Sequence, residues 1–151
     1  MSGRQIGSEK MPDVYVLDSF ALVKFLQKDE GYYEEVLRLF HRAADDEVKL
    51  MVNIVNLGEV WYCVARTNST KRTDEIITEL IGLNVDVVEV DWALARQAAI
   101  FKAKGGISYA DCYAAATAKF KNARVVTGDP EFKRVEDQVQ VLWLGGAKKV
   151  K

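Results

Sequence analysis

Residues 14–26 read VYVLDSFALVKFL, a compact strand-like run that passes directly into a helical one. Segment 14–17 is typical of a buried strand, and the apolar residues from Ser19 onward fit a helix. Further strand-like runs follow, separated by longer runs of helical spacing, at residues 50–52, 85–90, 124–127 and 139–142. Strands that alternate with helices predict parallel βαβ units in an α/β fold, with helices on both faces of the sheet.

Capping residues indicate where several helices begin and end. One helix is expected from about Leu57 to Arg66. Asp91 is a candidate N-cap for a helix that ends near Gly105 and Gly106, and Ser108 opens an alanine-rich helix. The small side chains of this last helix allow it to lie close to its neighbours.

A single domain over residues 11–146 fits the composition. The chain has 151 residues, of which 49% are apolar, and no repeat or linker divides it. We expect a polar tail at 1–10 and a short basic tail at 147–151. The apolar runs are too short to span a membrane, and no apolar signal segment opens the chain. Cys63 and Cys112 form no CxxC pair and suit a reducing, cytoplasmic setting.

The charge balance gives no support for nucleic-acid binding. Acidic residues number 22 and basic residues 21, for a formal net charge of -1. Any contact with RNA therefore needs a local basic patch, or metal ions that bridge acids to phosphates. One basic cluster is either such a patch or, more simply, a solvated face: Lys102, Lys104, Lys119, Lys121 and Arg124.

Four acids stand where the elements meet. Asp18 follows the first strand and Asp129 the fourth, while Glu59 and Asp111 are expected in the first turn of a helix. All four positions can lie at one edge of a parallel sheet, where such folds place their functional crevice. Each acid also has a structural interpretation at the start of a helix. Asn56 to Glu59 and Ser108 to Asp111 resemble capping boxes, Asp129 before Pro130 resembles an N-cap, and Asp18 stands where the helix dipole favours an acid.

Clustered together, the four carboxylates would repel one another and raise each other's pKa values, and divalent cations relieve that repulsion. A ligand set made only of oxygens favours Mg²⁺ or Mn²⁺ over zinc. Such ions polarise a phosphodiester and help to form hydroxide, so the chemistry needs no His, Cys or Lys nucleophile. Nearby polar residues either orient these acids or cap helices and turns: Ser19, Asn56, Ser108 and Thr127.

Four segments together resemble the PIN-domain family, and within it the toxin ribonucleases of VapBC-type toxin–antitoxin pairs. They read VYVLDSFALVKFL (14–26), VNLGEVWY (55–62), SYADCYAAATA (108–118) and VVTGDPEF (125–132). The resemblance implies a three-layer α/β/α sandwich around a parallel sheet, and Mg²⁺- or Mn²⁺-dependent endonucleolytic cleavage of RNA. By position, the four family acids correspond to Asp18, Glu59, Asp111 and Asp129.

The same resemblance implies a homodimer and an antitoxin partner that covers the active-site cleft. Four aromatic residues either offer an exposed surface to a partner or pack in the core, and the second interpretation is favoured: Tyr32, Tyr33, Trp61 and Tyr62. Two other functions compete with the toxin. One is a PIN nuclease of RNA processing; the other is a catalytically silent module that binds RNA or protein, which four intact acids argue against. A phospho-acceptor receiver domain is disfavoured because a late Lys and an acidic pair after the first strand are missing.

Overall fold

The computed structural model describes residues 11–146, so the tails expected at 1–10 and 147–151 lie outside the described residues. Within the described range, five strands form one parallel sheet of order β3-β2-β1-β4-β5. The strands are β1 (Asp13–Leu17), β2 (Val48–Asn53), β3 (Val85–Val88), β4 (Arg124–Thr127) and β5 (Gln140–Trp143). The predicted parallel α/β fold is confirmed.

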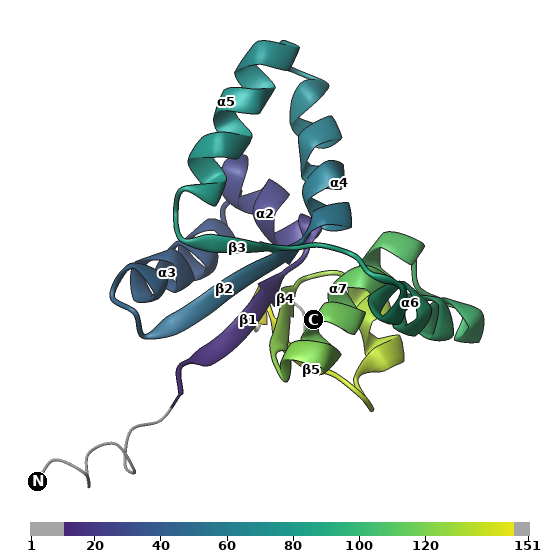
Figure 1. Cartoon of the computed structure of the whole chain (residues 1–151). Coiled ribbons are helices and arrows are strands. Elements are labelled where there is room, and N and C mark those ends of the chain that lie inside the picture. Colours follow the sequence, from purple (N-terminus) through teal and green to yellow (C-terminus); the bar gives the residue numbers. More distant parts are fainter. Residues whose placement is uncertain (1–10, 147–151) are drawn as a thin grey trace, which may run out of the picture.

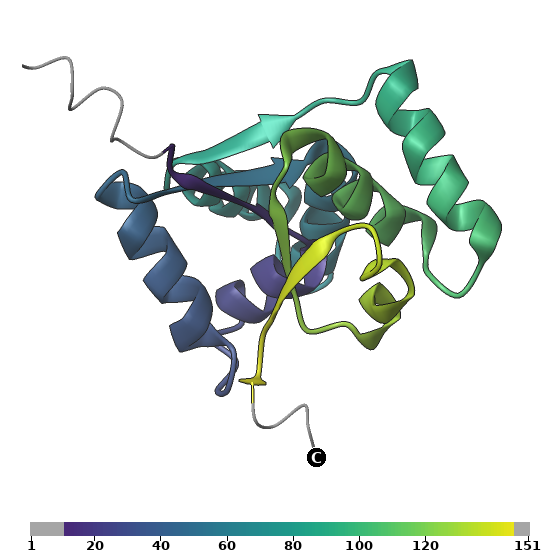
Figure 2. The ribbon, with the colours of Figure 1, turned by 90° about the horizontal axis from the view of Figure 1, so that it is seen from below.

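Helices cover both faces of this sheet (Figures 1 and 2). One face carries α2 (Ser19–Leu26), α3 (Tyr33–Ala44), α4 (Ile54–Ala65) and α5 (Thr70–Ile81). The other face carries α6 (Trp92–Lys104), α7 (Tyr109–Lys121) and the 3-10 helix η1 (Pro130–Val135). The architecture is therefore a three-layer α/β/α sandwich.

Successive residues of the strands supply two separate cores. Tyr15 and Leu17 of β1 are buried against α2 to α5, whereas Val16 between them is buried against α6 and α7. β4 does the same, with Val126 in the first core and Val125 in the second. Burial on both faces explains why these strands read as continuous apolar runs rather than as alternating ones.

The order of the strands reverses between β1 and β4. From β1 the chain proceeds to β2 and β3 on one side, and it later returns to place β4 and β5 on the other side. Leu17 is in register with Val126, and the Asp18 backbone amide donates to the Val126 carbonyl at 3.3 Å. In doubly wound sheets the crevice beyond the strands at such a reversal is where ligands bind.

Several element boundaries differ from the sequence-based prediction; β2, for example, spans Val48–Asn53 instead of residues 50–52. α4 begins at Ile54 rather than near Leu57, because the Asn53 side chain caps it by accepting from the Val55 amide at 2.8 Å. Asn56 is therefore not an N-cap, and Glu59 lies in the second turn rather than the first, so the capping-box interpretation of this pair was wrong. β3 stops at Val88, and β5 runs one residue later than expected.

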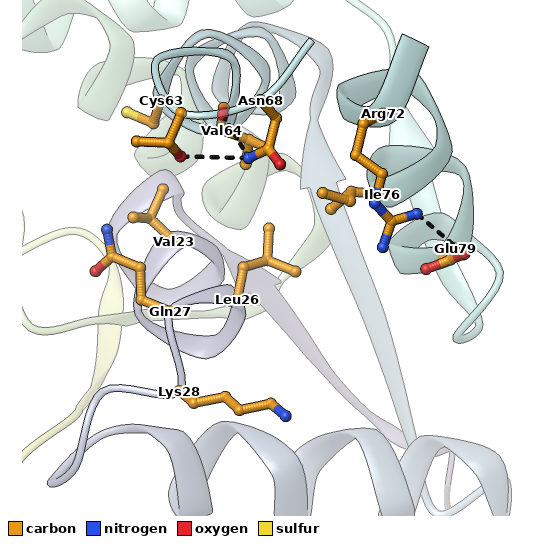
Figure 3. Close-up of a pocket in the computed structure, with 11 residues that line it drawn as sticks. Val23, Leu26, Gln27, Lys28, Cys63, Val64, Asn68, Arg72, Ile76 and Glu79 are labelled. Carbon is orange, nitrogen blue, oxygen red and sulfur yellow. Dashed lines mark hydrogen bonds and ion pairs between the residues drawn. The ribbon is translucent and has the colours of Figure 1, made fainter. Parts of the chain in front are cut away.

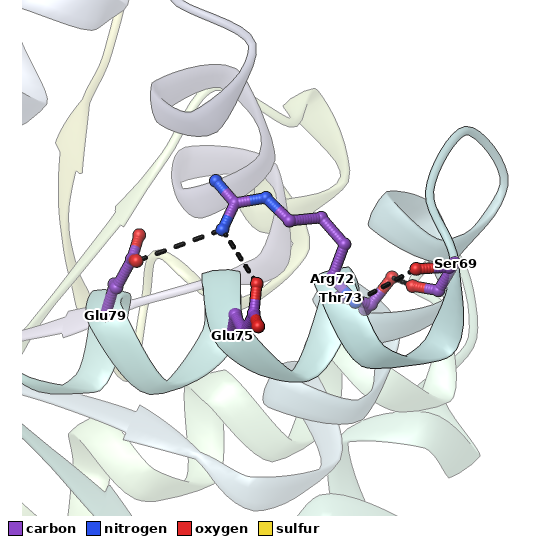
Figure 4. A network of polar contacts seen from close by, with 5 residues as sticks. All are labelled: Ser69, Arg72, Thr73, Glu75 and Glu79. Carbon is purple, nitrogen blue, oxygen red and sulfur yellow. Dashed lines mark hydrogen bonds and ion pairs between the residues drawn. The ribbon is translucent and has the colours of Figure 1, made fainter.

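A local polar network lies at the start of α5, the second helix of the α4–α5 hairpin (Figure 4). Ser69 caps α5 by accepting from the Arg72 amide at 3.1 Å, and the Thr73 hydroxyl donates to the Ser69 carbonyl at 2.8 Å. Arg72 also contacts Glu75 at 3.2 Å and Glu79 at 3.9 Å. These exposed ion pairs contribute at most about 1 kcal/mol, so the cap is the stronger determinant of where α5 starts. None of the helices in residues 11–146 has the length and apolarity needed to cross a bilayer.

Candidate functional site

Asp18 stands at the reversal point, directly after β1. It caps α2, with Oδ1 accepting from the Ala21 amide at 2.8 Å, and its side chain is fully buried. Its other oxygen, Oδ2, is buried without a hydrogen-bond partner among the described residues. A buried oxygen left in this state is costly, so capping alone does not explain why the residue is Asp.

Burial raises the pKa of Asp18 from 3.8 to about 7. The Thr127 hydroxyl beside the carboxyl and the Ala21 amide oppose this rise, and the negative charges of Asp129 and Glu59 add to it. The last two contributions place Asp18 within electrostatic reach of two other predicted site acids. Thr127 was expected beside the last acid, Asp129, and it also lies next to the Asp18 carboxyl.

Asp111 lies in the first turn of α7 and is buried. Ser108 caps this helix, as expected, by accepting from the Asp111 amide at 3.3 Å. Burial raises the pKa of the Asp111 carboxyl well above its usual range, and the neighbouring charges of Asp18 and Asp129 raise it further. No ion pair within residues 11–146 involves Asp18, Asp111 or Asp129, so the described part of the chain does not neutralise them.

Asp129 follows β4 and caps η1, with Pro130 at the first position of that helix. Its amide donates to the Thr127 hydroxyl at 2.9 Å, and its Oδ1 accepts from the Glu131 amide at 2.9 Å. Carboxylate oxygens of Asp111, Asp129 and Glu131 all lie within 4.8 Å of one another. Glu131 was not among the predicted site residues. Its position two residues after Asp129 was the one sequence feature that pointed to a place in the site.

Glu59 is held beside the other acids by hydroxyl and amide groups. The Ser19 hydroxyl donates to Glu59 Oε1 at 2.7 Å, and Asn56 Nδ2 approaches the same oxygen at 3.5 Å. Asn56 Nδ2 also donates to the Ala110 carbonyl at 3.0 Å, which ties α4 to the start of α7. Asn56 Oδ1 is buried without a partner among the described residues. Ser19 and Asn56 therefore contact the predicted acid cluster directly.

This donor set fits a hard divalent cation. It consists of carboxylate oxygens, it has buried carboxyl groups with raised pKa values, and Asp18 Oδ2 lacks a partner. Mg²⁺ and Mn²⁺ prefer such oxygen ligands. Asp111, Asp129 and Glu131 form the tightest group, whereas Asp18 and Glu59 lie outside that group and approach it from β1 and α4.

Three further features lie outside the group of acids, although one of them, Tyr62, contacts Glu59. A hollow of about 600 Å³ opens between α2, α4 and α5, where Val23 and Leu26 face Ile76 (Figure 3). Cys112 of α7 is buried in the core, and burial raises the pKa of its thiol to about 11. Tyr62 is 48% exposed, so the core-packing interpretation was wrong for this one of the four aromatic residues. Its hydroxyl donates to Glu59 Oε2 at 3.5 Å.

Fold and site thus define a doubly wound α/β domain with an acidic centre at its topological switch point. The family model of the PIN domain matches residues 15–138, and the chain belongs to the PIN-domain family. The predicted resemblance to this family is confirmed. No curated protein sequence matches the chain.

Solved structures show the same fold at low sequence identity. The chain is similar to the DNA-bound VapBC from Salmonella typhimurium, with a TM-score of 0.68, 18% identity, and coverage of 86% of this chain and 97% of that one. VapBC2 from Rickettsia felis, bound to promoter DNA, gives a TM-score of 0.66 at 14% identity, with 87% and 98% covered. VapC20 from Mycobacterium tuberculosis, a toxin that cleaves the sarcin–ricin loop, gives 0.63 at 18% identity, with 79% and 92% covered.

Proposed function

We propose that this chain is a Mg²⁺- or Mn²⁺-dependent endoribonuclease, the toxin of a type II toxin–antitoxin pair. The observation that carries the proposal is the set of uncompensated acids at the switch point. Asp18 and Asp111 are buried with raised pKa values, and no basic side chain in the described residues pairs with either. Proteins retain such repulsion where function requires it.

In the proposed site, Asp18, Asp111 and Asp129 would hold the cation, with Glu59 beside them. When bound, the cation would supply charge neutralisation at the phosphodiester and a lowered pKa for attacking water. The chain's own groups fix the acids in place. Ser19 and Asn56 orient Glu59 through Oε1, and the Thr127 hydroxyl holds the turn that presents Asp129.

The family and the similar structures support a proposal for the partners of this chain. VapBC complexes and a toxin–antitoxin complex from Klebsiella pneumoniae share this fold. By analogy, we propose a cognate antitoxin that covers the acidic centre, a homodimeric assembly, a cytoplasmic location and an RNA substrate. A nuclease of RNA processing would have the same chemistry but no inhibitor protein.

The test compares wild-type protein with Asp111→Asn on a mixed RNA pool, with Mn²⁺ or with EDTA. Asp137→Asn is the matched control, because it makes the same chemical change at an exposed acid outside the cluster. We expect metal-dependent cleavage by wild type and by the control, and a loss of at least about a hundredfold in Asp111→Asn, since the buried acid cannot be replaced as a ligand.

Equal cleavage by wild type and Asp111→Asn would refute the assigned site. The toxin assignment is tested separately by inducing the chain in a bacterial host. Growth arrest that Asp111→Asn abolishes would support it, whereas metal-dependent cleavage without growth arrest would favour an RNA-processing nuclease.

A further inference from the structure

Glu131 links two of the elements that carry the proposed metal ligands. It is the second residue of η1, directly after Pro130, and its side chain is exposed. Its Oε1 accepts from the Ser108 backbone amide at 2.9 Å, although the two residues are 23 positions apart in the sequence. Its own amide donates to Asp129 Oδ1 at 2.9 Å. Glu131 therefore contacts the turn that presents Asp129 and also the start of α7.

The loop between α6 and α7 is packed against residues of α6 and η1. Gly105 and Gly106 both have positive φ, at 82° and 80°, and the chain turns here between α6 and α7. Lys102 of α6 holds the loop from one side by donating to the Ile107 carbonyl at 3.0 Å. From η1, Arg134 packs so closely that a Cβ at Gly106 would lie 2.5 Å from its Nε.

A continuous chain of hydrogen bonds connects the two acids. Asp129 accepts from the Glu131 amide, Glu131 accepts from the Ser108 amide, and the Ser108 hydroxyl accepts from the Asp111 amide. These bonds join α7 to η1 where carboxylate oxygens of Asp111 and Asp129, which repel one another when ionised, lie within 4.8 Å.

We propose that Glu131 is a positioning residue, which fixes the N-terminus of α7 against η1 and so sets the separation of Asp111 from Asp129. The inference rests on the proposed function for its catalytic consequence. The structural part of the inference, that Glu131 fixes the start of α7, rests only on the hydrogen bond from the Ser108 amide. Glu131 acts as a hydrogen-bond acceptor, so the role requires its oxygen and not its charge.

The experiment separates the role of the Glu131 oxygen from the role of its charge. Glu131→Gln retains an oxygen that can accept from the Ser108 amide, and Glu131→Ala does not. Lys133→Ala is the control for disturbing η1, because Lys133 is exposed on the same helix. The readouts are Mn²⁺ affinity by calorimetry, kcat and KM for RNA cleavage, and hydrogen exchange of the Ser108 amide.

We expect Glu131→Ala to weaken Mn²⁺ binding about tenfold and to lower kcat similarly, as the loss of one hydrogen bond implies. KM for RNA should change little. The Ser108 amide should exchange faster in Glu131→Ala. Glu131→Gln should keep Ser108 exchange within about twofold of wild type and lose less Mn²⁺ affinity than Glu131→Ala, and Lys133→Ala should stay within about twofold of wild type in all readouts.

If Glu131→Gln loses Mn²⁺ affinity as severely as Glu131→Ala, the negative charge of Glu131 acts directly on the cation and the positioning role is overturned. Unchanged Mn²⁺ affinity and Ser108 exchange in Glu131→Ala would overturn it as well. Failure of the proposed function looks different: wild type itself would then neither bind Mn²⁺ nor cleave RNA. In that case exchange at Ser108 would still report whether Glu131 fixes α7.

Discussion

Replacing Asp18 by Asn should stabilise the metal-free protein at alkaline pH. The folded-state pKa of Asp18 is raised from 3.8 to about 7, so its ionised form is disfavoured in the fold. A shift of about 3 units corresponds to about 4 kcal/mol, which the folded state loses progressively as pH rises from about 4 to above 7. At low pH the carboxyl is neutral in both folded and unfolded chains, and no loss arises.

Asn has nearly the same shape, keeps an oxygen for the Ala21 amide and carries no charge. We therefore expect Asp18→Asn to exceed wild type in free energy of unfolding by about 2–4 kcal/mol at about pH 8 in EDTA, and by much less at about pH 5. Urea unfolding followed by circular dichroism at both pH values measures the difference. Saturating Mn²⁺ should restore stability to wild type and not to the variant, because ligand binding stabilises only the form that binds.

A variant that is less stable than wild type at about pH 8 in EDTA would refute this reasoning. So would a stability difference that does not change between the two pH values. Either result would mean that Asp18 contributes mainly as the cap of α2 and not as an ionised group held at a cost.

Three further predictions concern stability and can be checked by urea unfolding. Gly128→Ala should cost about 1–3 kcal/mol, because the new Cβ would lie 2.4 Å from Phe20 Cε1; an unchanged unfolding midpoint would contradict this. Thr117→Val should cost about 1–3 kcal/mol, since it leaves the buried Asn53 amide, now 2.9 Å from the Thr117 hydroxyl, without its acceptor; a neutral result would show that Asn53 finds another partner. Ser69→Ala should cost about 1 kcal/mol through loss of the α5 cap, and Ser69→Gly less, so the reverse order would argue against capping.

The sequence was sufficient to predict the parallel sheet and its helices because both signals are local. Apolar runs such as 14–17 and caps such as Asp91 and Ser108 occur where the structure has them. The start of α4 was misplaced because two Asn residues three positions apart, Asn53 and Asn56, can each begin a helix. In the structure Asn53 caps the helix, and Asn56 lies inside it and donates to the Ala110 carbonyl, a tertiary contact that no local pattern reveals.

The candidate site was partly predictable for a related reason. Asp18 and Asp129 each follow a strand, and the parallel arrangement brings the ends of β1 and β4 together. Glu131 was missed because its contact partner, Ser108, lies 23 residues earlier and no local pattern records that approach. The exposure of Tyr62 escaped prediction too, since helical spacing does not reveal which face of α4 remains uncovered.

The strand order has a consequence for synthesis on the ribosome. β1 lies at the centre of the sheet, yet its neighbour β4 comes more than a hundred residues later and brings Asp129 and Glu131 with it. A growing chain that has emerged only through α6 contains Asp18 and Glu59 but neither Asp111 nor Asp129. The proposed centre is therefore incomplete throughout most of translation, so a cell that makes this chain meets the complete set of acids only when the polypeptide is nearly finished.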